Sequence, residues 1–259
     1  MTAAAIPGQR SLGTFHLWMA GLFVLIAFSG FAVTYWMQLP AATFVGRPML
    51  HLHGLLFSAW TLFYFSQTWL IAGRRTLHHR AWGVAGVSLA TAMFFVGMAT
   101  AIDSMHEGIA QGHAEAATAF AIVPITGIIV FAILVGLAVV SVKTPETHKR
   151  FMFLATVSIL QAALGRFFFL AIFGGGPGNR PGVHPPAPVA TTLGAGVIVG
   201  LLIVAALVYD WRKTGKLHPV TLWGGLAVVA LEFLRVPLSA TPQWMAMADW
   251  FGAFAAYGL

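Results

Sequence analysis

The chain has 259 residues, of which 59% are hydrophobic and only 8% are charged, and its mean hydropathy is +0.84. Soluble domains carry about 25% charged residues, so this composition indicates an integral membrane protein; the lack of cysteine excludes disulfides and thiolate metal sites. The net charge of +7 does not indicate nucleic-acid binding, because the basic residues are confined to short connections between apolar segments.

Seven apolar stretches are long enough to cross a bilayer, which takes about 20 helical residues. The first of them is too long for the apolar core of a signal peptide and is interpreted as a membrane span. The predicted fold class is an all-α integral membrane bundle of seven transmembrane helices, which forms a single domain over residues 1–238. The predicted spans are 14–37, 50–72, 81–102, 116–142, 151–173, 189–211 and 220–238.

Lysine and arginine are distributed unequally between the two sets of connections. The N-terminal tail and three tight turns, near residues 75, 146 and 214, together carry ten of them. The opposite connections carry only Arg47 and Arg180. Because cytoplasmic loops of membrane proteins are enriched in these residues, the N-terminus is predicted to be cytosolic and the C-terminus external.

The connections on the external side are longer. Residues 103–115 are acidic and contain histidine, and a short interfacial helix is expected there, whereas residues 174–188 are rich in glycine and proline and predict an irregular loop. Thr241 followed by Pro242 indicates a helix start. Residues 239–259 are predicted to form an interfacial C-terminal helix, because the stretch is short for a span. Its aromatic face, within residues 241–258, is a candidate surface for a membrane-protein partner besides the lipid bilayer.

Ten histidines are unusual in a chain with only 14 basic and 7 acidic residues. Five of them lie beside basic clusters. Four of these, His78, His79, His148 and His218, are interpreted as capping helix ends or meeting anionic headgroups; a second cofactor site there is the alternative. The other five lie near the external ends of the spans. Polar groups at membrane depth are costly and therefore indicate a site.

The external group supplies the predicted metal ligands. His51 and His53 project about 200° apart on a helix and so do not bind one ion together. Asp103 and His106 share a helix face if the third span continues that far, and His113 follows. Imidazole nitrogen with carboxylate oxygen suits zinc, iron, copper or manganese. The alternative is a set of solvated polar groups. The predicted ligands are His51, His53, Asp103, His106 and His113.

Three charged residues lie inside predicted spans. Glu232 and Arg235 are three residues apart and are expected to pair on one helix face. Arg166 has no partner in its own helix, so its forked donors are predicted to hold a carboxylate or another anion. Arg166, Glu232 and Arg235 are expected to face the bundle interior, to approach one another and to form a cofactor-binding or anion-binding site. A structural ion network, with Gln161 as a further partner, is the alternative.

The segments HLHGLLFSAWTLFYFSQTWLIAGRRTLHHRAWGVAG, THKRFMFLATVS and LHPVTLWGG resemble those of uncharacterised polytopic membrane proteins of proteobacteria. The start of the third span, which contains His and Arg, is more loosely similar to the corresponding segment of cytochrome b561-like and haem-oxidase-assembly membrane proteins. These resemblances imply a bacterial inner (cytoplasmic) membrane location and a bound haem, without identifying its ligands.

Three functional hypotheses follow. The first is a membrane redox or metal protein with a histidine-based centre in the external half, holding copper, iron or zinc, or haem b, as in a metal- or haem-dependent oxidoreductase. The second is a transporter or binding protein for a small anion that uses Arg166 and Arg235. The third is a structural or assembly subunit of a membrane complex.

Overall fold

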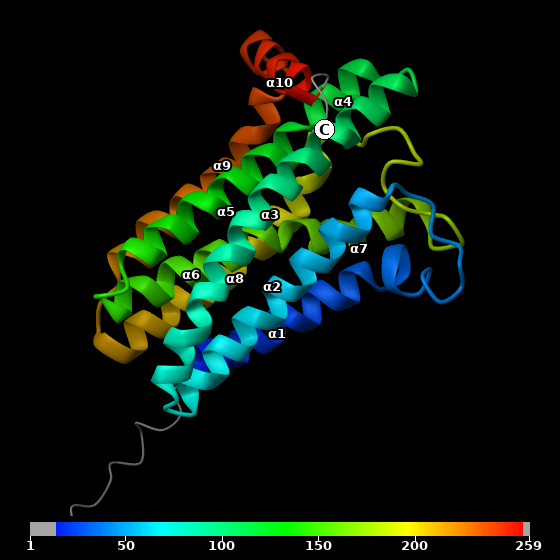
Figure 1. Cartoon of the computed structure of the whole chain (residues 1–259). Coiled ribbons are helices and arrows are strands. Elements are labelled where there is room, and N and C mark those ends of the chain that lie inside the picture. The colour runs from blue at the N-terminus through cyan, green and yellow to red at the C-terminus, as the bar shows by residue number, and fades with distance from the viewer. Residues whose placement is uncertain (1–13, 256–259) are drawn as a thin grey trace, which may run out of the picture.

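The structure is a computed structural model that describes residues 14–255, and every regular element in this part of the chain is helical (Figure 1). The elements are α1 (Phe15–Phe31), the π-helical turn η2 (Ala32–Trp36), α2 (Pro48–Ala72), α3 (Thr76–Ala110), α4 (Ala114–Phe120), α5 (Ile122–Val140), α6 (Pro145–Ile159), α7 (Gln161–Phe173), the 3-10 turn η3 (Val189–Thr192), α8 (Leu193–Thr214), the π-helical turn η4 (Val220–Gly224), α9 (Gly225–Leu238) and α10 (Pro242–Ala255).

The prediction of seven apolar helices of membrane-spanning length is confirmed. Within the described residues, seven helical segments are long and apolar enough to cross a membrane: Phe15–Trp36, Pro48–Ala72, Thr76–Ala110, Ala114–Val140, Pro145–Phe173, Val189–Thr214 and Val220–Leu238. We call the end of the bundle with connections 73–75, 141–144 and 215–219 the basic end. We call the opposite end, with connections 37–47, 111–113, 174–188 and 239–241, the loop end.

Local sequence signals set several helix ends. Pro48 and Pro145 occupy the first turns of α2 and α6, where the missing backbone N–H would have no helical partner. Gly215 ends α8 with φ of 71°, a left-handed conformation that glycine adopts without strain. At the start of α10 the Thr241 hydroxyl accepts a hydrogen bond of 3.2 Å from the Trp244 N–H, so the predicted N-cap is confirmed.

The third span differs from the prediction in its length. α3 continues to Ala110, so Asp103 and His106 lie on its last turns and not on a separate interfacial helix. A short turn, 111–113, then leads into α4, which is continuous in direction with α5 as part of one span. The third helix continues because no proline or glycine interrupts it between Ala99 and Glu107.

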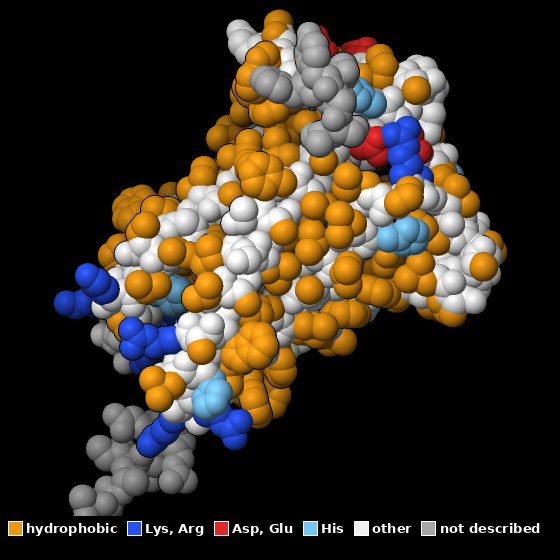
Figure 2. Space-filling view, viewed as in Figure 1, with side chains coloured by type: hydrophobic (Ala, Val, Ile, Leu, Met, Phe, Trp, Pro, Cys, Tyr) orange, Lys and Arg blue, Asp and Glu red, His pale blue; other side chains and the backbone are white. Residues whose placement is uncertain are grey.

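The interior of the bundle is packed with aromatic and aliphatic side chains. Trp60, Phe23, Phe131 and Phe153 are fully enclosed within one core cluster. α5 packs against α6, α2 against both α1 and α3, and α7 against α1 and α8. The outer surface is also apolar along the length of the helices (Figure 2). In this view most basic side chains gather at one end, and the acidic side chains that are visible lie at the other end beside a basic one. Such a surface matches a lipid environment.

α10 packs back on its own chain. It contacts α3 and α4, and the Trp244 Nε1–H donates to the Thr118 carbonyl at 2.9 Å. Trp244 and Ala248 are buried in this contact, whereas Met247 and Trp250 are exposed. One side of α10, the segment predicted to bind a partner, is therefore already covered by the bundle. Residues 256–258 lie outside the described residues.

Candidate functional site

The two histidines at the start of α2 diverge, as helical geometry requires. His51 is exposed, and its Nδ1 lies 3.0 Å from the Tyr35 hydroxyl. His53 is half-buried and stacks on Phe57 with 4.1 Å between ring centroids. The His53 Nδ1 is buried and has no hydrogen-bond partner in the described part of the chain. The Tyr35 ring packs directly against Gly54, and a Cβ added at Gly54 would lie 3.2 Å from this ring.

Asp103 and Glu107, one turn apart on α3, each bind an arginine from a different loop. Asp103 forms an ion pair with Arg47, which precedes α2. Glu107 Oε1 lies 3.4 Å from a guanidinium nitrogen of Arg180, which also donates to the Val45 carbonyl. These contacts fasten two loops of the loop end to α3. Asp103, a predicted metal ligand, and its neighbour Glu107 therefore each neutralise an arginine.

His106 and His113 lie in separate surroundings. His106 faces α10, since a Cβ on Gly252 would lie 3.1 Å from its Nε2. His113 precedes α4 and, with Glu115, lines an open hollow of about 390 Å³. Among residues 14–255, no three His, Asp or Glu side chains gather closely enough to hold a metal ion. The structure does not bring His51, His53, Asp103, His106 and His113 together in one cluster, and a metal site built from some of them stays a prediction.

Glu232 and Arg235 form a buried network in the bundle interior, and their side chains are 2% and 1% exposed. Arg235 Nη1 donates to Glu232 Oε2 at 2.6 Å and to Gln161 Oε1 at 2.7 Å. Arg235 Nε donates to Thr126 Oγ1 at 2.8 Å. The expected pairing is thus confirmed, with Gln161 as a further partner. The charge of Arg235 is neutralised within the chain.

Arg166 takes no part in the ion pair or hydrogen bonds of that network, so the expected cluster of all three charged residues is not formed. Its guanidinium lies over the Phe31 ring at 5.1 Å and interacts electrostatically with His53 and with Arg180, which has the same charge. Arg166 is seven residues before the end of α7 at Phe173, about 10 Å along the helix axis. It forms no ion pair with any Asp or Glu of the described residues.

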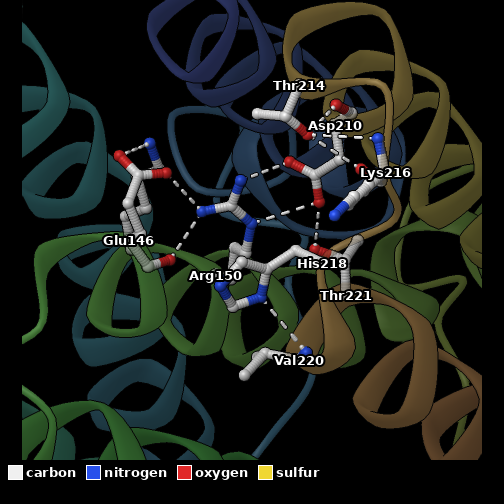
Figure 3. A network of polar contacts seen from close by, with 9 residues as sticks. Glu146, Arg150, Asp210, Thr214, Lys216, His218, Val220 and Thr221 are labelled. Atoms are coloured by element: carbon white, nitrogen blue, oxygen red, sulfur yellow. Dashed lines mark hydrogen bonds and ion pairs between the residues drawn. The ribbon is translucent and has the colours of Figure 1, made fainter.

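A second buried network joins α6, α8 and η4 at the basic end (Figure 3). Arg150 forms an ion pair with Asp210, and its Nη1 donates to Glu146 Oε2 at 2.7 Å. Thr221 Oγ1 donates to Asp210 Oδ2 at 2.6 Å. Sequence reasoning counted Arg150 among the basic turns and passed over Asp210. Asp210 could have been singled out because it is one of only seven acidic residues in the chain and lies near the end of α8, beside basic residues.

Two histidines of the basic end have contrasting roles. His16 lies among aromatic rings of α1, α6 and α8, and both of its ring nitrogens are buried without a partner in the described part of the chain. His218, in the connection before η4, accepts a hydrogen bond of 3.2 Å from the Val220 N–H through Nδ1. Burial lowers the pKa of His218, and the nearby Arg150 guanidinium lowers it further. The His218 side chain therefore favours the neutral imidazole.

Comparison of the chain with family profiles, with curated proteins and with solved structures finds no match. The class of the protein follows from the helices themselves: seven apolar helices of sufficient length define a multi-pass helical membrane protein. The resemblance to cytochrome b561-like proteins stays a prediction.

Proposed function

We propose that the protein binds a small anion, such as a monocarboxylate, at Arg166 and carries it across the membrane. The observation behind this proposal is a guanidinium inside a membrane-spanning helix that no carboxylate of the described residues neutralises. The other arginine deep in a span, Arg235, is paired with Glu232 at 2.6 Å and supplies the contrast.

An unpaired arginine in a span is energetically costly. Insertion scales put arginine at the helix centre near +2.5 to +3.5 kcal/mol, with less nearer the ends, and a bound anion offsets part of this cost. The forked N–H donors of arginine match the two oxygens of a carboxylate or phosphate group. Arg180 adds a second positive charge to the potential at Arg166, which favours an anion further.

The neighbours of Arg166 favour a ligand with an apolar part. The Phe31 ring lies 5.1 Å from the guanidinium, and the half-buried imidazole of His53 lies within range of its charge. Aromatic and neutral imidazole rings contribute apolar contact area, while a few polar groups orient the ligand. A carboxylate with a short hydrocarbon or aromatic portion therefore fits better than a fully hydrated inorganic anion.

The proposal is tested by calorimetric titration of the purified, detergent-solubilised protein with acetate, benzoate and inorganic phosphate. We expect one saturable site for at least one carboxylate, and at least tenfold weaker binding in Arg166→Gln. Arg166→Lys should bind more weakly than the wild type because a single ammonium lacks the fork.

Arg212→Gln is the matched control, because Arg212 is exposed in the last turn of α8. It should bind like the wild type. Binding that is equal in Arg166→Gln and wild type, or no binding of any of the three anions, would contradict the proposal.

A redox or metal function is the second candidate, and the unpartnered Nδ1 of His53 favours it. The free nitrogen of this imidazole could bind the iron of haem b, and Arg166 could then hold a haem propionate. The same nitrogen could instead bind a copper, iron or zinc ion. An absorbance spectrum and elemental content of the purified protein test this directly. Cofactor content that His53→Ala leaves unchanged would place the centre elsewhere.

We further propose a bacterial inner membrane location with the basic end in the cytosol. The Lys and Arg of the tight connections support this orientation, because positively charged loops are retained on the cytoplasmic side. Arg166 and the two loops fastened by Arg47 and Arg180 then lie toward the external side. Entry of the anion from outside is expected to pass these loops.

A further inference from the structure

His79 and His148 bring two imidazole rings together at the basic end of the bundle. His79 lies in the first turn of α3 and His148 in the first turn of α6, from helices far apart in the sequence. Their ring centroids are 6.2 Å apart and the ring planes are almost perpendicular, at 79°. Both side chains are half-buried, and the Nδ1 of His79 is buried with no partner in residues 14–255.

The separation of the rings fits a shared metal ion. A metal bound about 2.1 Å from an imidazole nitrogen lies about 3.2 Å from the ring centroid, so two rings sharing an ion have centroids at most about 6.4 Å apart. The distance of 6.2 Å between His79 and His148 falls inside this limit. A small rotation of either ring brings the pair to the smaller spacing of a tetrahedral site.

The backbone orients one of the two rings for this role. The Nδ1 of His148 lies 2.8 Å from the Ala138 carbonyl oxygen, which accepts only from a protonated nitrogen. The proton is therefore on Nδ1 in the neutral ring, and Nε2 carries the free lone pair. A histidine that binds a metal commonly donates its other ring N–H to a carbonyl or carboxylate in this way.

Two of the neighbouring cations are engaged with other groups. The Arg75 guanidinium lies 5.2 Å from the centroid of the Trp69 ring, and Lys149 forms an ion pair of 2.7 Å with Glu146. These contacts direct the flanking positive charges toward other groups, which reduces repulsion of a cation between the rings.

We propose that His79 and His148 form a binding site for a late first-row transition-metal ion, such as copper(II) or zinc. Imidazole is a preferred ligand of these ions, and two protein ligands leave coordination positions open for water or a small molecule. This site lies at the opposite end of the bundle from Arg166 and is independent of the proposed anion function.

The test is a titration of the full-length protein, purified without a histidine tag, with copper(II) and with zinc. Electron paramagnetic resonance of the first copper equivalent should show two imidazole nitrogens. His79→Gln and His148→Gln should each weaken binding of this equivalent at least tenfold, because each removes one of two protein ligands. Thermal unfolding of each variant shows whether it keeps the fold.

His78→Gln provides a matched control, because His78 is the exposed chain neighbour of His79 and points in another direction on the helix. It should leave copper affinity and nitrogen coordination unchanged. The proposal is overturned if His78→Gln weakens binding as much as His79→Gln. It is overturned equally if the wild-type spectrum shows fewer than two imidazole nitrogens, a result that does not depend on any variant folding.

Discussion

Arg150 and Asp210 are 60 residues apart in the chain, yet they form an ion pair whose side chains are only 4% and 3% exposed. The pair joins α6 to α8, and Thr221 extends it to η4 with a hydrogen bond to the same carboxylate. Three spans are thereby connected at the basic end through one buried acid. Removal of a single partner leaves the other charge buried without compensation.

Asp210→Asn should consequently lower the free energy of unfolding by about 3 kcal/mol, measured by denaturant titration in mixed micelles. The double variant Arg150→Met, Asp210→Leu should lose less than the single variant, since apolar packing replaces both charges. Glu146→Gln serves as the comparison: Glu146 is 58% exposed, so a change within about 1 kcal/mol is expected. Equal losses in Asp210→Asn and Glu146→Gln would contradict a special role for the buried pair.

A close approach between α1 and α7 depends on the absence of a side chain at Gly30. A Cβ at this position would overlap the Ala163 backbone carbonyl and lie 3.0 Å from the Ala163 Cβ. Gly30→Ala should therefore destabilise the protein by about 1–3 kcal/mol, the usual cost of overpacking. Gly136→Ala, on α5, is the control because nothing lies within 4 Å of its added Cβ. It should be neutral or stabilising by up to about 1 kcal/mol. A reversed order in thermal unfolding would argue against the α1–α7 contact.

His218 should make stability depend on pH. Its pKa is lowered in the folded protein, so the unfolded chain binds the proton more readily, and stability should fall as pH decreases below the unfolded value of about 6.5. Protonation also removes the Nδ1 acceptor that caps the Val220 N–H. His218→Asn keeps a side-chain oxygen for the cap but does not titrate. The difference in unfolding midpoint between pH 7.5 and pH 5.5 should shrink in this variant. An unchanged difference would assign the pH dependence to other groups.

The proposed topology predicts opposite locations for two loops. A reporter fused after Gly112 should be external, and one fused after Lys143 should be cytosolic, because an odd number of spans separates them. Alkaline phosphatase and green fluorescent protein fusions report the two sides. If both positions report the same compartment, the span Ala114–Val140 does not cross the membrane.

Properties that depend only on residues close together in the sequence could be predicted from the sequence alone. Hydropathy over a window of about 20 residues locates all seven spans, since each helix satisfies its own backbone hydrogen bonds in lipid. The pairing of Glu232 with Arg235 was predictable for a similar reason: residues three apart share a face of one helix. The Thr241 cap of α10 is equally local.

Relationships between helices were decided only by the tertiary structure. The arrangement of the spans separates Arg166 from Glu232 and Arg235, pairs Asp103 and Glu107 with loop arginines, and brings His79 to His148. Hydropathy assigns a residue to a span but not to the neighbour that it faces, because all seven helices are apolar around most of their circumference. The packing of side chains between helices sets the rotation of each helix, and that rotation determines which charged groups meet.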